Sequence, residues 1–163
     1  MFSTALICMS NLAGATLASA DVIPNPYHFQ YAAKFVCAVN MPGFSTSTTS
    51  ILPGSYKTVV NIHNPQNQTV KFGEKIASAI FTNDVSGLVT ATLLPDQALA
   101  VDCDKMAKIF GPAVHSPIDG FLVIDSPVSL DVTAVYTVGK NPDQGGEVES
   151  FAVEQVHERT LNP

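Results

Sequence analysis

The sequence predicts a mainly β protein, an immunoglobulin-like two-sheet β-sandwich with one α-helix. Three observations support this fold class. Short strand-like runs recur along the chain, turn residues separate them at intervals of about 8–12 residues, and a single segment has helical periodicity. The chain has 163 residues, of which 46% are apolar and 13% are charged. It is therefore long and apolar enough to fold as one domain, which we place at residues 21–163.

The first predicted strand covers residues 29–39, where apolar and polar side chains alternate and so point to opposite faces. The second covers residues 55–63 and ends before Pro65, because proline cannot extend a strand ladder. A third covers residues 69–81, with a bulge or break expected at Gly73. A fourth covers residues 88–94. The inward face of the first strand comprises Phe29, Tyr31, Ala33, Phe35, Cys37 and Val39.

Residues 95–110 predict the single helix, because their apolar side chains recur at helical spacing. Pro95 and Asp96 suit the start of a helix, and Gly111 followed by Pro112 suits its end. The apolar helical face comprises Leu99, Cys103, Met106 and Phe110.

Three further strands are expected in the last third of the chain. Residues 120–124 form a continuous apolar run, typical of a central strand buried on both faces. Residues 130–138 alternate again, with Leu130 and Val132 on the inward side. Residues 147–156 carry charges that favour an edge position, and we expect this to be the last strand.

Residues 1–20 have the apolar stretch and the Ala18-Ser19-Ala20 ending of a cleaved signal peptide, although the usual positive charge is missing. A start site placed too far downstream would explain that gap, and a short buried or amphipathic helix is the alternative. Removing this leader with Cys8 leaves Cys37 and Cys103. We therefore predict a secreted or periplasmic protein with one disulfide, the alternative being two buried free thiols.

The charge distribution excludes several partners. The formal net charge is −6, and the eight Lys and Arg residues are scattered without a basic stripe. Such a surface repels phosphate backbones and anionic lipids, so we expect neither nucleic-acid nor lipid-surface binding. The polar residues that interrupt the leader also argue against a membrane span, and none is expected in the mature form.

Catalytic chemistry finds little support in the sequence. Ser45 follows Gly43-Phe44, but the second glycine of a nucleophile elbow is missing. A cysteine in a disulfide cannot act as a thiolate nucleophile. We therefore predict no enzyme activity, no catalytic residue and no cofactor.

Metal binding is the alternative that the sequence leaves open. The four histidines lack short-range ligand spacing, so we expect no metal site from local sequence. A site assembled from distant residues would use His63, His115 and Asp131. Asp84 and Asp125 could join Asp131 in a calcium loop, but no twelve-residue loop pattern is present, which favours turn-stabilising roles.

Five segments resemble a group of uncharacterised small exported bacterial proteins, and the similarity extends over residues 27–156. The resemblance implies an exported β-rich domain and supplies no activity. The segments are residues 31–37, 61–65, 101–103, 120–124 and 130–137.

The leading functional hypothesis is an exported, non-enzymatic module that acts through surface binding, adhesion or an envelope-associated interaction. Its partner would be an unknown protein or glycan, or a second copy of the chain. The alternative is a periplasmic protein that binds a metal or small ligand through dispersed residues. Candidate surfaces are the Ser/Thr run at 45–50, the segment 64–68 and the last strand. Asn67 begins a glycosylation sequon.

Overall fold

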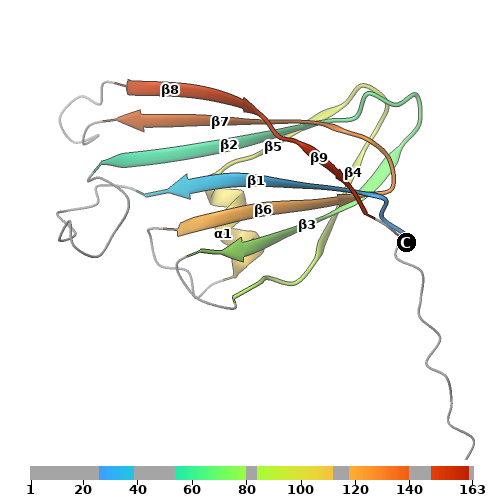
Figure 1. Cartoon of the computed structure of the whole chain (residues 1–163), viewed down its shortest axis with the longest axis horizontal. Helices are drawn as coiled ribbons and strands as arrows, with labels where there is room; N and C mark the ends of the chain where they lie inside the picture. Colours follow the sequence, from blue (N-terminus) through green and yellow to red (C-terminus); the bar gives the residue numbers. More distant parts are fainter. Residues whose placement is uncertain (1–25, 39–53, 80–83, 112–117, 140–147, 162–163) are drawn as a thin grey trace, which may run out of the picture.

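The computed structural model describes residues 26–38, 54–79, 84–111, 118–139 and 148–161. These residues form two antiparallel sheets and one short helix (Figure 1). The elements are β1 (Phe29–Cys37), β2 (Ser55–His63), β3 (Val70–Ser78), β4 (Val89–Leu93), β5 (Ala98–Val101), α1 (Cys103–Phe110), β6 (Ile118–Ser126), β7 (Asp131–Gly139), β8 (Val148–Gln155) and β9 (Glu158–Thr160).

The five-stranded sheet has the order β4-β3-β6-β1-β9, and the four-stranded sheet has the order β5-β2-β7-β8. The predicted two-sheet sandwich with one helix is therefore confirmed for the described residues. The immunoglobulin-like label is not confirmed. β1 and β2 belong to different sheets, whereas the first two strands of an immunoglobulin domain share one sheet.

The core fills the space between the sheets and contains the inward side chains that the alternation predicts. Phe35 on β1, Ile62 on β2 and Val132 on β7 are all fully buried. Burying such aliphatic and aromatic side chains stabilises a fold by about 1.5–3 kcal/mol each. The two sheets are also joined at one corner, where Ala38 and Tyr56 exchange two backbone hydrogen bonds of 3.0 and 2.8 Å.

The helix is shorter than predicted, and its expected first half is different structure. Asp96 adopts a positive φ of 56° in a turn, and β5 follows at Ala98–Val101. The helix begins only after Asp102, whose carboxylate accepts a hydrogen bond of 2.8 Å from the Lys105 backbone N–H. This is the usual N-cap arrangement. Leu99 misled the prediction because it fits both a helical spacing to Cys103 and an alternating strand.

Gly73 forms no bulge, so that expectation was wrong. It pairs in register with Thr90 on β4 and Asp125 on β6. A β-carbon at this position would lie 2.7 Å from the Leu88 side chain. Glycine here therefore leaves room for Leu88 to pack across the strand.

Strand β6 is central in its sheet but is not buried on both faces. Leu122 and Ile124 are fully buried, whereas Phe121 on the opposite face is 41% exposed. The predicted edge strand is present as β8, at the edge of the four-stranded sheet. It is not the last strand, because β9 follows and pairs with β1.

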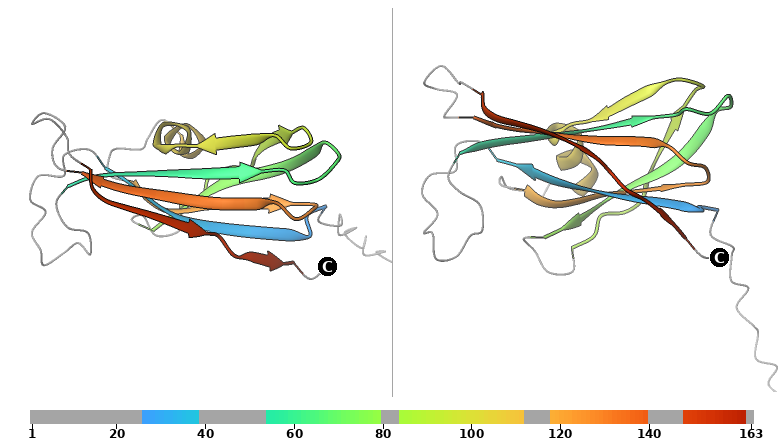
Figure 2. Two further views of the ribbon diagram at one scale, coloured as in Figure 1. Left: turned by 90° about the horizontal axis from the view of Figure 1, so that it is seen from above. Right: turned by 45° about the horizontal axis from the view of Figure 1, so that its top comes forward.

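The structure joins Cys37 to Cys103 through a disulfide, with their Cα atoms 5.7 Å apart. This bond attaches the first residue of α1 to the end of β1. The helix packs against β2, β3 and β5, and the Met106 side chain is fully buried in the core. Figure 2 shows α1 on the side of the molecule opposite β8.

Candidate interaction surface

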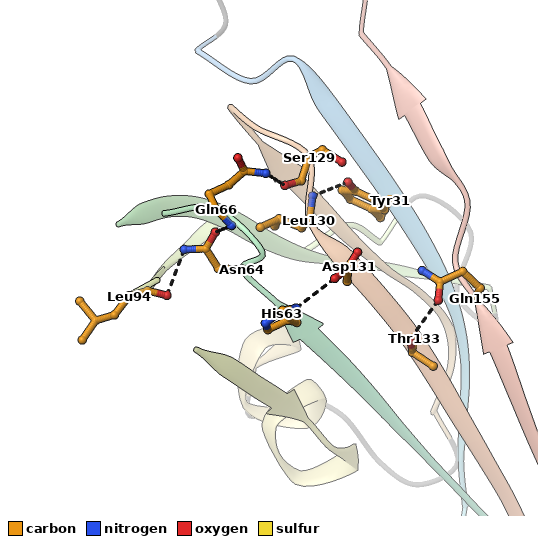
Figure 3. A network of polar contacts seen from close by, with 10 residues as sticks. All are labelled: Tyr31, His63, Asn64, Gln66, Leu94, Ser129, Leu130, Asp131, Thr133 and Gln155. Carbon is orange, nitrogen blue, oxygen red and sulfur yellow. Dashed lines mark hydrogen bonds and ion pairs between the residues drawn. The ribbon is translucent and has the colours of Figure 1, made fainter. Parts of the chain in front are cut away.

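Two of the three residues proposed for a dispersed metal site lie together. His63 ends β2 and stands opposite Asp131, the first residue of β7. Its Nδ1 lies 3.0 Å from the Asp131 Oδ2, and both side chains are partly exposed (Figure 3). The third residue, His115, lies outside the described residues.

Metal ligation has no further support in the part of the chain that the structure describes. No group of three or more His, Cys, Asp or Glu side chains is gathered there. The proposed calcium ligands Asp125 and Asp131 also have different hydrogen-bond partners. Asp125 accepts 2.8 Å hydrogen bonds from Lys75 and Gln30, while Asp131 faces His63. These carboxylates form cross-strand pairs.

The segment 64–68 is a fixed structural turn. Asn64 is fully buried, and its amide donates hydrogen bonds to the backbone oxygens of Gln68 at 2.9 Å and Leu94 at 3.0 Å. Its side-chain oxygen accepts a 3.0 Å hydrogen bond from the Gln66 N–H. The turn before β3 is thereby tied to the turn before β5 (Figure 3).

Gln66 extends this network to the turn between β6 and β7, because its amide donates to the Ser129 carbonyl at 3.1 Å. The side chains of Asn64 and Gln66 are therefore used inside the protein, whereas Pro65, Asn67 and Gln68 are exposed. Asn67, the sequon residue, is exposed at the tip. The Ser/Thr run at 45–50 and the leader at 1–20 lie outside the described residues.

A tyrosine beside this turn ties β9 to the rest of the sheet. Tyr31 is 1% exposed, and its hydroxyl donates a 2.5 Å hydrogen bond to Glu158 while accepting one of 2.7 Å from the Leu130 N–H. Burial and the neighbouring Glu158 carboxylate raise the pKa of Tyr31 to about 12.

A buried carboxylate, missed at the sequence level, lies beneath the helix. Glu74 on β3 points inward between Phe72 and Ile76 and is fully buried. Its Oε1 accepts a 3.2 Å hydrogen bond from Lys105 on α1, and its Oε2 lies 3.1 Å from the same Nζ but has no hydrogen bond among the described residues. The alternation along β3 could have revealed it, because Glu74 lies two residues from Phe72 and two from Ile76 and therefore shares their face. The pair attaches α1 to β3.

The outer face of the five-stranded sheet is charged. Lys34 pairs with Asp119 across β1 and β6, and Lys75 pairs with Asp125 across β3 and β6. The Lys34 ammonium also lies 5.1 Å from the centre of the Phe121 ring. Partly exposed pairs of this kind contribute about 0–1 kcal/mol each, so they mainly make this face hydrophilic.

Strand β8 is the longest edge strand among the described residues. The other edge strands, β4, β5 and β9, contain five, four and three residues, whereas β8 contains eight. It has neither proline nor lysine, the residues that commonly protect an edge. Phe151 and Val153 are 64% and 58% exposed.

These two side chains share the outer face of the four-stranded sheet. Phe151 stands opposite Thr137, and Val153 stands opposite Val135. On the other face, the Tyr136 hydroxyl donates a 2.7 Å hydrogen bond to Glu154. Burial and this carboxylate raise the pKa of Tyr136.

The backbone of β8 has unused hydrogen-bonding capacity. The Val156 N–H donates to the Val132 carbonyl at 2.9 Å, and hydrogen-bonded pairs alternate along an antiparallel ladder. Ala152 and Glu154 therefore bond toward β7. The N–H and C=O groups of Phe151, Val153 and Gln155 point away from β7, where no described strand lies.

Comparisons with known proteins support the fold alone. Neither a family model nor a curated protein sequence matches this chain. The chain is structurally similar to the crystal structure of Thermotoga maritima 1070, with a TM-score of 0.53, 8% sequence identity and coverage of 82% of this chain and 95% of that chain. Fold similarity at this identity carries no residue roles. Among the described residues, no helix is both long and apolar enough to cross a membrane.

Proposed function

We propose that this chain is an exported, non-enzymatic binding module, and that β8 is its binding edge. The observation that carries the proposal is the combination of unused backbone groups and exposed apolar side chains on one long edge strand. Strand addition uses both, because main-chain hydrogen bonds give affinity and alternate side chains give specificity. The partner class that fits is an extended polypeptide segment.

Two other described surfaces support this choice by contrast. The outer face of the five-stranded sheet is occupied by ion pairs, and within the segment 64–68 internal hydrogen bonds hold the side chains of Asn64 and Gln66. The outer face of β8 at Phe151 and Val153 carries no charge. Desolvating it on binding therefore costs little, whereas desolvating the charged face would be expensive.

A photocrosslinker placed in the native host tests the binding edge. Val153→p-benzoylphenylalanine should give a discrete adduct with a polypeptide after irradiation. The matched control is Lys71→p-benzoylphenylalanine, since Lys71 is exposed on the charged sheet. An adduct at both positions, or at neither, contradicts the proposal.

Export is tested by the mass of the protein recovered from the host. Cleavage after Ala20 gives a chain that begins at Asp21, with Cys37 and Cys103 as its two cysteines. We expect no reaction with an alkylating reagent before reduction and two added groups afterwards. A full-length mass, or two groups added before reduction, contradicts the export proposal.

A further inference from the structure

We propose that the segment added at β8 is the β8 strand of a second copy of this chain. The two strands would run antiparallel about a two-fold axis through Ala152, perpendicular to the sheet. This inference rests on the proposed function, because it takes β8 as the binding edge. It would merge two four-stranded sheets into one sheet of eight strands.

The backbone geometry of β8 allows this pairing. With the axis at Ala152, Phe151 stands opposite Val153 of the second copy, and Val153 stands opposite its Phe151. Both residues direct their N–H and C=O groups away from β7, so each of these pairs can exchange two hydrogen bonds. Ala152 then stands opposite Ala152 of the second copy, and the two form a close, non-hydrogen-bonded pair. A small side chain suits that position, because Cα atoms there are about 4.5 Å apart.

The side-chain pattern selects this register over its neighbours. A two-fold axis perpendicular to the sheet places the same strand face of both copies on the same side. The possible registers therefore differ from one another by two residues. An axis at Phe151 would pair Phe151 with its own copy and set Val153 against the start of β8, where the ladder with β7 shifts register between Ser150 and Val148. An axis at Val153 would place Phe151 opposite Gln155. Only an axis at Ala152 sets both exposed apolar residues against apolar residues.

Charge is also compatible with the register centred on Ala152. Glu154 stands opposite Ser150 of the second copy, so its carboxylate faces an uncharged residue. Like charges directly opposite would be destabilising. Each chain carries a formal charge of −6, so the two copies repel each other at long range. Salt screens this repulsion, and the dimer should therefore tighten as ionic strength rises.

Single cysteines at the edge test both the pairing and its register. Cys37 and Cys103 are joined to each other, and all variants also carry Cys8→Ser, so that the introduced thiol is unpaired even in a chain that keeps the leader. In Ala152→Cys the two Cα atoms would be about 4.5 Å apart, within disulfide range. In the matched control Ser150→Cys, the two copies are four residues out of register, or about 13 Å apart, and cannot bond. Both positions are exposed and on the same strand face.

We expect sedimentation to show a dimer that tightens with salt. Mild oxidation should give covalent dimer in Ala152→Cys at least tenfold more than in Ser150→Cys, as resolved by non-reducing electrophoresis and mass. Equal crosslinking of both variants would overturn the register. A monomer at all concentrations with no crosslink in Ala152→Cys would overturn self-pairing.

These outcomes separate the inference from the proposed function. If the Val153 photocrosslinker traps a different polypeptide while the purified chain is monomeric, self-pairing fails and the binding edge stands. If the Val153 adduct contains a second copy of this chain, both stand. If there is neither an adduct nor a dimer, both fail.

Discussion

At one edge of the four-stranded sheet lies β5, a strand of four residues that leads directly into α1. The helix packs beside it, the disulfide from Cys103 to Cys37 attaches the helix to β1, and Lys105 attaches it to Glu74 on β3. At the other edge lies β8, a strand of eight residues with exposed Phe151 and Val153 and no described strand beyond it.

These two edges differ in how their unpaired backbone groups are protected. A free edge presents unpaired backbone groups to other chains, and proteins usually shorten or cover such an edge. Here the β5 edge is short and flanked by covalent and ionic attachments. The β8 edge is long, and no described strand lies beyond it. Changes near α1 should therefore alter stability, while changes on β8 should alter association.

Removing the disulfide should give the largest effect on stability. The bond closes a separation of 66 residues, and on the chain-entropy account its loss costs about 4 kcal/mol. Chemical denaturation of Cys37→Ala combined with Cys103→Ala measures this cost, with the wild type as the reference. Hydrogen exchange should rise in α1 and β5 more than in β8. An equal rise in hydrogen exchange at the β5 and β8 edges would show that the disulfide does not stabilise the β5 edge selectively.

Breaking the buried ion pair should have the next largest effect. Lys105→Met leaves the Glu74 carboxylate buried without its cation, which should cost roughly 2–3 kcal/mol, since the lysine is partly exposed. Adding Glu74→Met removes the orphaned charge and should recover most of the loss. Urea unfolding of the single and double variants checks this pattern. A double variant less stable than Lys105→Met would contradict it.

Alkaline pH should weaken the attachment of β9, the edge strand beside β1. The folded pKa of Tyr31, about 12, exceeds the unfolded value of 10.0, so the folded state holds the proton more tightly. The resulting stability is full below pH 10 and is lost as pH rises toward 12. By pH 11.5 the loss is about 2 kcal/mol.

The Tyr31→Phe variant isolates that contribution. It lacks the hydroxyl, so its stability should fall less than that of the wild type between pH 9 and pH 11.5. Tyr136 remains in both proteins and contributes a loss of the same sign. Urea unfolding at the two pH values makes the comparison. Equal losses in the two proteins would assign the alkaline effect to other groups.

Substitutions on β8 should change stability least. Phe151→Ser combined with Val153→Thr alters exposed side chains, so the free energy of unfolding should shift by no more than about 0.5 kcal/mol per site. The same variant should sediment as a monomer at concentrations where the wild type is a dimer. Exposed Lys71→Ser provides a control that keeps the dimer. A monomeric control would show that association does not depend on β8.

Local sequence patterns predicted the strands well where one face is buried. The observed β2 has the predicted bounds, and Tyr31, Phe35 and Cys37 of β1 face the core as expected. Period-two alternation is a direct consequence of the strand geometry, so it survives in the folded protein. The short strand β9 carries no such signal, because its three exposed residues are held by pairing with β1.

The candidate surfaces were harder to predict because they depend on which strands meet. The register that sets His63 beside Asp131 is a long-range property, and so is the placement of Lys105 over Glu74. The edge position of β8 followed from its charges, but its exposed Phe151 and Val153 did not stand out. Apolar residues in a strand usually point inward, and only the packing of the two sheets shows that these do not.

The pairing of β1 with β9 has a mechanical consequence. Phe29 stands opposite Thr160, and the Leu161 N–H donates to the His28 carbonyl at 2.7 Å, so the first and last strands meet at one end of the molecule (Figure 1). A load applied through both ends would therefore peel β9 away one hydrogen bond at a time. The sandwich beneath would carry little of that tension.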